Sequence, residues 1–296
     1  MAHILGVGIA TLDIINHLDG YPIEDSEVRA DAQQICRGGN ATNTLTVLSQ
    51  LGEQCEWCGV LANDPGSQTI RQDLQHHRIG FQHCRVQEDG ATPTSYIILN
   101  RQNGSRSIVH YRDLAELDLA TFKHHDLGRY QWLHFEGRAV NETLLMMQYA
   151  KQQQPHLPCS LEIEKPREGI EKLFPKADVL LFSRHYAEAN GYQSATDLLH
   201  AIQPQAPHAR LICAWGDQGA YALEPQGSII HAPAHKQWQV VDSLGAGDTF
   251  NAGIIHNLLA GTPLLQALHN SCYLAALKCS QQGFANLAER YLQPKH

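Results

Sequence analysis

Short apolar runs typical of buried strands alternate with segments in which apolar residues recur at helical spacing. The strand-like runs lie at 3–8, 56–60, 132–136, 160–165, 179–183, 211–215 and 220–223. Helix-like spacing occupies 45–51, 66–78, 143–152, 195–202 and 250–259. This order predicts an α/β fold around a doubly wound, largely parallel sheet. The carboxyl ends of strands in such a sheet line one crevice, and there ligands bind.

Three regions interrupt this rhythm. Residues 12–18 alternate imperfectly, 28–35 form a β-rich run, and two further β-rich runs, 94–99 and 107–111, flank the hairpin signal Asn103-Gly104. We expect these regions to form a small β-sheet lid beside the crevice, with lid segments at approximately 12–36 and 92–112. No repeat or linker divides the chain, so we expect a single domain over 1–296.

Composition narrows the function classes. The 296 residues are 43% hydrophobic and 18% charged, and the net charge of −8 comes without a basic cluster, which argues against a nucleic-acid partner. No apolar run approaches the roughly 18 residues of a membrane span, and no signal-peptide pattern is evident. The eight irregularly spaced cysteines predict reduced thiols in a cytoplasmic protein. The lone C-x-x-C at Cys55–Cys58 lacks a second pair, so we expect no zinc site.

The most informative segment is the turn Gly245-Ala246-Gly247, which opens a helix. Such a turn exposes backbone N–H groups beside the positive end of the helix dipole, a ready site for an anion. Asp248 follows at once, and a carboxylate beside an anion is repulsive unless it has a chemical role. That role would be to take a proton from a hydroxyl that attacks a phosphoryl group. On spacing alone, a simple helix-capping Asp is an equally good interpretation.

A second glycine pair, Gly38-Gly39, leads into the helix that carries Asn40 and Asn43. The two asparagines are three apart and share one side of the first turn. They are either caps, which is the stronger interpretation by itself, or groups that bind a polyhydroxylated ligand. Asp13, expected at the end of the first strand, could bind ligand hydroxyls or cap a turn.

Two common nucleotide motifs are missing. The first strand ends in Gly6 and Gly8, but Thr11 stands where a dinucleotide fingerprint needs its third glycine. This argues against a nicotinamide-dependent dehydrogenase. A P-loop sequence is also missing, so phosphate must be held in another way, and the glycine turn at 245–247 meets that need.

The chain resembles the ribokinase-like (PfkB) sugar kinases over nearly its whole length. The resemblance rests on the segments 38–43, 134–138, 162–168, 213–215 and 241–251. The segment 241–251 is the most specific for the family. The runs Phe135-Glu136-Gly137-Arg138 and Glu162-Ile163-Glu164-Lys165-Pro166-Arg167-Glu168 are similar to the ketohexokinase branch, the hepatic-type fructokinases.

The resemblance implies a ribokinase-like three-layer α/β/α domain with a small β-sheet lid, often used to form a homodimer. It implies that Asp248 is the base and that Gly245, Ala246 and Gly247 form the anion hole. The implied sugar-binding residues are Asp13, Gly39, Asn40, Asn43 and Asp248. The implied ATP-binding residues are Arg106, Gly216, Asp217, Gln218 and Gly219, together with the glycine turn. Arg138 and Lys165 would lie close to the crevice.

The expected reaction is ATP-dependent phosphorylation of D-fructose to fructose 1-phosphate, with Mg²⁺ and with activation by K⁺ left open. The alternatives are a related kinase for ribose, adenosine or another ketose, or a non-catalytic sugar-binding protein, which the intact base and turn disfavour. One departure concerns the family's Asn-x-x-Glu motif, linked to magnesium placement. Here it reads Ser183-Arg184-His185-Tyr186, so no metal ligand is assigned.

Overall fold

The main sheet has nine strands in the order β15-β14-β13-β12-β11-β10-β1-β4-β6, in a computed structural model that describes residues 1–292. Every pair from β6 to β13 is parallel, and β14 and β15 are added antiparallel. The strands are β1 (His3–Val7), β4 (Gln54–Cys58), β6 (Ile79–Gly80), β10 (Trp132–Glu136), β11 (Cys159–Ile163), β12 (Val179–Ser183), β13 (Arg210–Ala214), β14 (Ala220–Leu223) and β15 (Ile229–Ala232). The expected parallel α/β sheet is therefore present.

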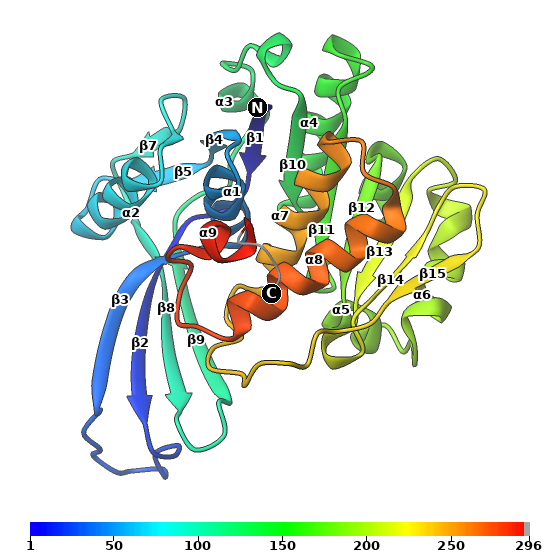
Figure 1. Ribbon diagram of the computed structural model, residues 1–296. Helices are drawn as coiled ribbons and strands as arrows, with labels where there is room; N and C mark the ends of the chain where they lie inside the picture. Colours follow the sequence, from blue (N-terminus) through cyan, green and yellow to red (C-terminus); the bar gives the residue numbers. More distant parts are fainter. Residues whose placement is uncertain (293–296) are drawn as a thin grey trace.

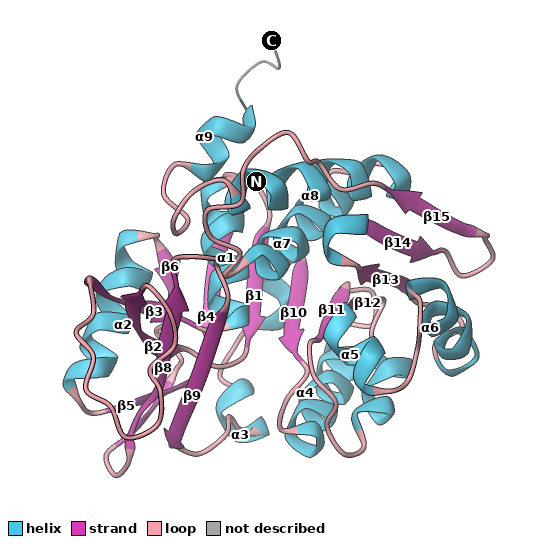
Figure 2. Cartoon of the chain, turned by 90° about the horizontal axis from the view of Figure 1, so that it is seen from below, coloured by secondary structure: helices cyan, strands magenta, loops and turns pink. Residues whose placement is uncertain are grey.

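Helices cover both faces of this sheet and give three layers (Figure 2). One face carries α1 (Asn40–Gln50), α2 (Pro65–His76), α7 (Ala246–Leu259), α8 (Leu264–Cys279) and α9 (Leu287–Leu292). The other carries α3 (Leu119–Phe122), α4 (Val140–Gln153), α5 (Arg184–Ala189) and α6 (Ala195–Ile202). Short 3₁₀ turns lie at Leu127–Arg129, Ile170–Lys176, Gln203–Gln205 and Gly216–Gln218.

Strand β12 shows why the central strands read as continuous apolar runs. Val179 and Leu181 pack into the core under α7 and α8, whereas Leu180 and Phe182 pack into the core on the opposite face. Successive side chains of a strand point to opposite faces, and here both faces are covered by helices. Every position of the strand is therefore apolar except its last, Ser183.

A separate four-stranded sheet, called the small sheet below, projects from the main body (Figure 1). Its order is β3 (Ala32–Gly38), β2 (Thr11–Leu18), β8 (Ala91–Asn100) and β9 (Arg106–Asp113). Strands β8 and β9 pair antiparallel around the expected turn at Asn103-Gly104. A minor two-stranded sheet joins β5 (Val60–Ala62) and β7 (Arg85–Gln87).

The placement of Asp13 differs from the expectation. Strand β1 already ends at Val7, so Asp13 is the third residue of β2 in the small sheet. Asp13 and Ile15 are buried and face the main body, whereas the apolar Ile14 belongs to the outward row. A polar residue on the buried face and apolar residues on the outer face explain why the alternation of this strand looked imperfect.

Candidate active site

A crevice of about 440 Å³ lies where the inner face of the small sheet meets the carboxyl ends of the main strands and the start of α7. Most residues singled out from the sequence line it: Asp13, Gly39, Asn40, Asn43, Arg106, Arg138, Lys165, Gly245, Gly247 and Asp248. These residues come from six separate stretches of the chain. The fold therefore brings the expected cluster together at the carboxyl ends of the strands, where open α/β sheets bind ligands.

The glycine turn begins α7. Gly245 caps the helix with a φ of 76°, a left-handed backbone that glycine adopts without strain, and a Cβ there would clash with the Phe284 ring at 2.4 Å. Its carbonyl accepts from the Thr249 N–H at 2.9 Å. Gly247 is exposed, and a side chain there would meet nothing within 4 Å. The Ala246 N–H already donates to the Ser243 carbonyl at 3.3 Å. Gly245 and Gly247 line the crevice, and no side chain caps this 14-residue helix, an arrangement suited to an anion.

Asp248 lies in the first turn of α7 and is only 6% exposed. Its Oδ2 accepts a hydrogen bond of 2.8 Å from the Asn43 amide. Burial raises the pKa of Asp248 to about 7, and the charges of Glu164 and Glu136 add to that effect, while the Asn43 hydrogen bond opposes it. Its side chain does not cap the helix. A carboxyl group with this pKa is a good proton acceptor near neutral pH.

Asn43 connects Asp248 to a buried arginine. The Asn43 Oδ1 accepts from Arg37 Nη1 at 2.9 Å, so the amide is oriented from both ends. Arg37 is 5% exposed, and its other N–H groups bond Thr42, Thr46 and Asp73. The sequence analysis missed Arg37. Its only signal was a charged residue immediately before the Gly38-Gly39 pair.

Asn40 binds two acidic side chains, one within β11 and one directly after it. Its Nδ2 donates to Glu162 Oε1 at 3.2 Å and to Glu164 Oε2 at 3.1 Å. Asn251 Nδ2 also donates to Glu162 Oε1, at 3.2 Å, but Glu162 Oε2 is buried without a partner within residues 1–292. Burial, aided by the nearby Asp248 charge, raises the pKa of Glu162 well above its usual range. The sequence analysis did not assign Glu162 to the site. Its signal was a charged residue between the apolar Leu161 and Ile163 of a buried strand.

Asp13 and Arg106 reach the crevice from the small sheet. Asp13 Oδ1 accepts from the Thr11 hydroxyl at 2.8 Å, and burial raises the pKa of its carboxyl group. Arg106, the first residue of β9, donates from Nη1 to the Ser243 hydroxyl at 3.0 Å. Since Ser243 lies two residues before Gly245, the guanidinium of Arg106 stands beside the glycine turn. This contact joins the small sheet to the main body across the crevice.

Arg138 follows β10 and is paired with acids. It contacts Glu136 Oε1 at 3.1 Å and Glu116 Oε1 at 2.9 Å, and burial is outweighed by these carboxylates, which raise its pKa. Lys165 is more exposed and lies 3.5 Å from Glu164. Both therefore line the crevice, as expected. Glu136, which also accepts from the Ile9 N–H at 2.9 Å, was not singled out from the sequence.

The segment Gly216–Gly219 lies just outside this crevice. It forms a tight 3₁₀ turn after β13, closed by the Trp215 N–H bond to the Gly219 carbonyl at 2.7 Å. The crevice reaches Ala214, at the end of β13, but none of these four residues, and not Ala246. A Cβ at Gly219 would come within 2.0 Å of the Ala232 carbonyl oxygen. Close packing between β14 and β15 is therefore sufficient to explain that glycine.

The crevice offers carboxylate oxygens that could help to hold Mg²⁺. Within residues 1–292, no group of three or more His, Cys, Asp or Glu side chains is arranged to hold a metal ion by itself. The unpartnered Glu162 Oε2 and the nearby Glu164 nevertheless supply the hard oxygen atoms that Mg²⁺ prefers. Ser183 instead caps α5 by accepting from the Tyr186 N–H at 2.9 Å. The site suits an ion that arrives with phosphates and keeps several waters.

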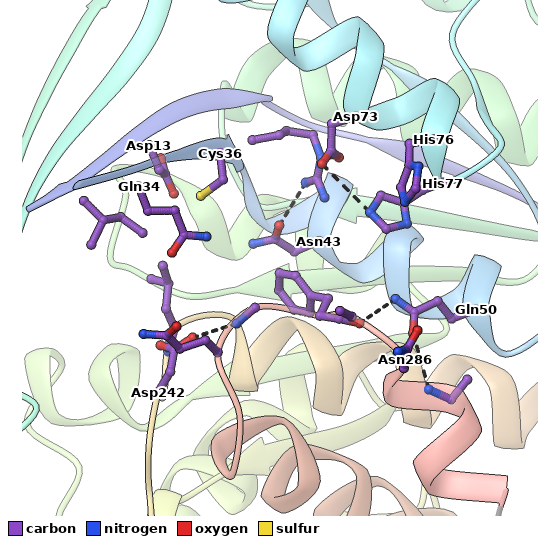
Figure 3. Close-up of a pocket in the computed structure, with 18 of the residues that line it drawn as sticks. Asp13, Gln34, Cys36, Asn43, Gln50, Asp73, His76, His77, Asp242 and Asn286 are labelled. Atoms are coloured by element: carbon purple, nitrogen blue, oxygen red, sulfur yellow. Dashed lines mark hydrogen bonds and ion pairs between the residues drawn. The ribbon is translucent and has the colours of Figure 1, made fainter. Parts of the chain in front are cut away.

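A second cavity of about 600 Å³ adjoins the crevice and shares Asp13 and Asn43 with it. In Figure 3, Asp73 and His76 of α2 and His77, which follows the helix, lie on one side of this cavity and Asp242 on the opposite side. Asp73 is already engaged by Arg37 at 2.5 Å. Asn43 and Arg37 both line this cavity.

Comparison with known proteins agrees with this geometry. Residues 1–290 match the family model described as pfkB family carbohydrate kinase. The chain is 40% identical over 289 residues to the ketohexokinase of Mus musculus, a match that covers 95% of this chain and 97% of the relative. The chain belongs to the PfkB family of carbohydrate kinases. The kinase is thus a phosphotransferase that uses an alcohol group as acceptor.

Solved structures show the same fold. The kinase superposes on a putative ribokinase from Agrobacterium tumefaciens with a TM-score of 0.87 at 22% identity, covering 99% of both chains. It also superposes on the ribokinase of Arabidopsis thaliana complexed with ribose and ATP, with a TM-score of 0.82 at 17% identity and the same 99% coverage of both chains. The expected ribokinase-like fold is confirmed.

Proposed function

We propose that this kinase transfers the γ-phosphoryl group of ATP to the 1-hydroxyl of D-fructose and yields fructose 1-phosphate. The observation that carries the reaction type is the position of Asp248, buried in the first turn of α7 directly beside the glycine turn. The choice of fructose is supported by the 40% identity to a ketohexokinase over 95% of the chain. The Phe-Glu-Gly-Arg run at 135–138 supports the same branch.

In the proposed reaction, Asp248 accepts the proton of the 1-hydroxyl while that oxygen attacks the γ-phosphorus. A bond forms between the sugar oxygen and the γ-phosphorus, and the bond from the γ-phosphorus to the bridging oxygen breaks. ADP leaves with the negative charge on that former bridging oxygen. Asp248 then returns the proton to solvent. Its pKa of about 7 suits this exchange because the group is a strong enough base near neutral pH yet is partly ionised there.

The charge of the transferred group would be neutralised by the amides of Gly245, Ala246 and Gly247 and by Arg106. Phosphoryl transfer depends mainly on such positioning and electrostatic stabilisation. Mg²⁺, when bound with ATP, supplies positive charge to the phosphate oxygens, and Glu162 and Glu164 are the residues that would hold its water ligands. Activation by K⁺ is left open. We assign the adenosine end of ATP to the neighbourhood of Gly216–Gly219, outside the crevice itself.

The hydroxyl groups of the sugar would be bound by Asp13, Gly39, Asn40 and Asn43. The two asparagines also have a positioning role, because Asn43 bonds Asp248 and Asn40 bonds Glu162 and Glu164. The small sheet would act as a lid that excludes water, with the Arg106 contact to Ser243 as its latch.

A related acceptor such as ribose, adenosine or another ketose is the alternative. The ring-bearing side chains that line the crevice are His110 and Phe182, and Tyr21 lies outside it and bonds Ser105. His110 lies near Asp13 and offers one ring to a nucleoside base, so the choice between these acceptors rests on a direct comparison of substrates.

A substrate panel tests the acceptor. ADP release is measured with ATP and Mg²⁺ against D-fructose, other ketoses, ribose and adenosine, with and without K⁺. We expect kcat/KM to be highest for D-fructose, and phosphorus NMR of the product should show the 1-phosphate. A higher kcat/KM for ribose or adenosine would contradict the fructose assignment.

The variant Asp248→Asn tests the base. We expect kcat to fall by roughly 10²- to 10⁴-fold, the usual contribution of a positioned general base. The matched control is Asp197→Asn, which changes an exposed aspartate in the first turn of α6. If Asp248→Asn keeps a near wild-type rate, Asp248 is not the base.

A further inference from the structure

Lys278 is the only buried lysine within residues 1–292, with 0% of its surface exposed. It lies in the last turn of α8, the helix that follows α7, and no step of the proposed reaction uses it. Burying an ammonium group is costly unless it is paired and hydrogen-bonded. Its surroundings therefore show what the charge is for.

The ammonium group contacts both the side chain and the backbone carbonyl of Asp242. Lys278 Nζ lies 2.5 Å from Asp242 Oδ2 and donates to the Asp242 carbonyl at 3.1 Å. The Phe284 ring lies 5.5 Å from the ammonium, a cation–π distance. The end of α8 adds its own carbonyl, since Cys279 O accepts from the N–H groups of Val241 and Asp242 at 2.7 and 3.1 Å.

Asp242 carries this anchor into the glycine turn. Its Oδ1 accepts from the Leu244 N–H at 2.8 Å, so the same carboxylate that binds Lys278 also shapes the residues directly before Gly245. Its Oδ2 also accepts from the Gly283 N–H at 3.2 Å. The Phe284 ring near Lys278 also lies close to Gly245, where an added Cβ would clash with it. Figure 3 shows Asp242 at the edge of the second cavity.

We propose that Lys278 is a positioning residue for phosphoryl transfer. It is an internal cation that holds Asp242 in place and thereby orients the amides of the glycine turn. The proposal rests on the proposed function, because that function makes the turn the anion hole. A buried ion pair adds little net stability compared with a packed apolar pair, and in some proteins it serves instead to fix one specific geometry. Amides aimed at developing charge lose much of their effect when displaced by a fraction of an ångström.

The test compares Lys278→Ala with Lys151→Ala. Lys151 is a matched control because it also pairs with an aspartate, Asp178 at 2.7 Å, and with a carbonyl, Leu157 O at 3.3 Å, but on α4 in the opposite layer. We expect Lys278→Ala to lower kcat at least about tenfold at saturating ATP and sugar, while the sugar KM stays within about twofold. Lys151→Ala should keep the wild-type kcat.

Chemical rescue separates positioning from a general loss of structure. The alanine variant leaves a cavity beside Asp242 that methylammonium can enter, and we expect added methylammonium chloride to restore kcat by at least about fivefold. Tetramethylammonium chloride at the same ionic strength is too large and should not. A loss of kcat that neither ion changes, or that follows the folded fraction measured by circular dichroism, overturns the proposal.

If Lys278→Ala does not fold, the double variant Asp242→Asn/Lys278→Met removes both charges and keeps the volume. The proposal then requires kcat at least about tenfold below wild type in folded protein, and a kcat within about twofold overturns it. The same twofold result in Lys278→Ala also overturns it. Failure of the proposed function differs, since the wild-type enzyme would then release no ADP with any sugar.

Discussion

Asp248 is a carboxyl group that the folded protein holds in an unfavourable place. It is buried, and Glu136 and Glu164 lie near enough for their charges to raise its pKa further. The Asn43 amide at 2.8 Å offsets part of this cost and orients the group. The same environment that makes Asp248 a useful base therefore makes its ionised form destabilising.

The raised pKa of about 7 predicts the pH dependence of activity. Only ionised Asp248 can accept the hydroxyl proton, so kcat/KM for the sugar should rise roughly tenfold per pH unit below pH 7 and level off above it. Initial rates between pH 5.5 and 8.5 measure this. A profile that is flat across pH 7 would contradict the assignment of this pKa to the base.

The same shift predicts a stability change of opposite direction. Because the folded state binds the Asp248 proton more tightly than the unfolded state, the free energy of unfolding falls as pH rises from about 4 to 7. Asp248→Asn removes the cost and should be more stable than wild type at pH 8, by at most about 4 kcal/mol. Urea unfolding at pH 8 and pH 5 measures the difference, which should shrink at the lower pH. An Asn variant less stable than wild type at pH 8 would refute this.

At the scale of elements, the start of α1 depends on a single glycine. Gly39 caps the helix with a φ of 107°, and a Cβ there would lie 2.2 Å from the Ile9 carbonyl oxygen. This close approach places Asn40 and Asn43 next to the end of β1 and the start of α7. The geometry of the crevice and the packing of α1 are therefore set at the same position.

The variant Gly39→Ala tests this dependence. We expect it to lower the free energy of unfolding by roughly 3 kcal/mol or more and to raise the sugar KM, because both the positive φ and the clash must be relieved. Gly191→Ala is the control: its φ is 84° but a Cβ meets nothing within 4 Å, so it should cost only about 1 kcal/mol. Equal costs in the two variants would show that the clash is unimportant.

At the scale of the whole molecule, the outer face of the small sheet carries a row of apolar side chains across all four strands. Register pairs Ile14 with Ile35 and Tyr96, and Tyr96 with Val109. Ile35, Tyr96 and Val109 are 53%, 49% and 69% exposed. Such a row is typical of an interaction surface, and it supports the predicted homodimer through this sheet.

A charge in the middle of this row tests the homodimer. We expect Val109→Asp to shift the sedimentation of the protein from dimer to monomer, because a carboxylate cannot be buried unpaired in an interface. Val86→Asp on β7, where the valine is 43% exposed, is the control and should leave the assembly unchanged. A wild-type protein that sediments as a monomer would refute the prediction.

Among the helices of residues 1–292, none combines the length and the apolar character that a membrane-spanning segment needs.

The sequence by itself determined the local features of this kinase. Periodicity located most strands and helices, and the glycine turn with Asp248 marked the proposed anion site, because turn chemistry and helix starts depend on residues adjacent in the chain. Strand β15 and helix α8 are among the elements that escaped this reading. Strand β15 is short, and α8 packs apolar residues against its neighbours over much of its surface, so neither shows a clear pattern.

Only the tertiary structure decided which distant residues share the crevice. Contacts such as Asn43–Asp248, Asn40–Glu162 and Lys278–Asp242 join positions that are 205, 122 and 36 residues apart. No local pattern encodes them, because each depends on how the layers pack. The face of β2 that holds Asp13, the exclusion of Gly216–Gly219 from the crevice and the shifted pKa of Asp248 follow from the same cause: burial and neighbouring charge exist only in the folded chain.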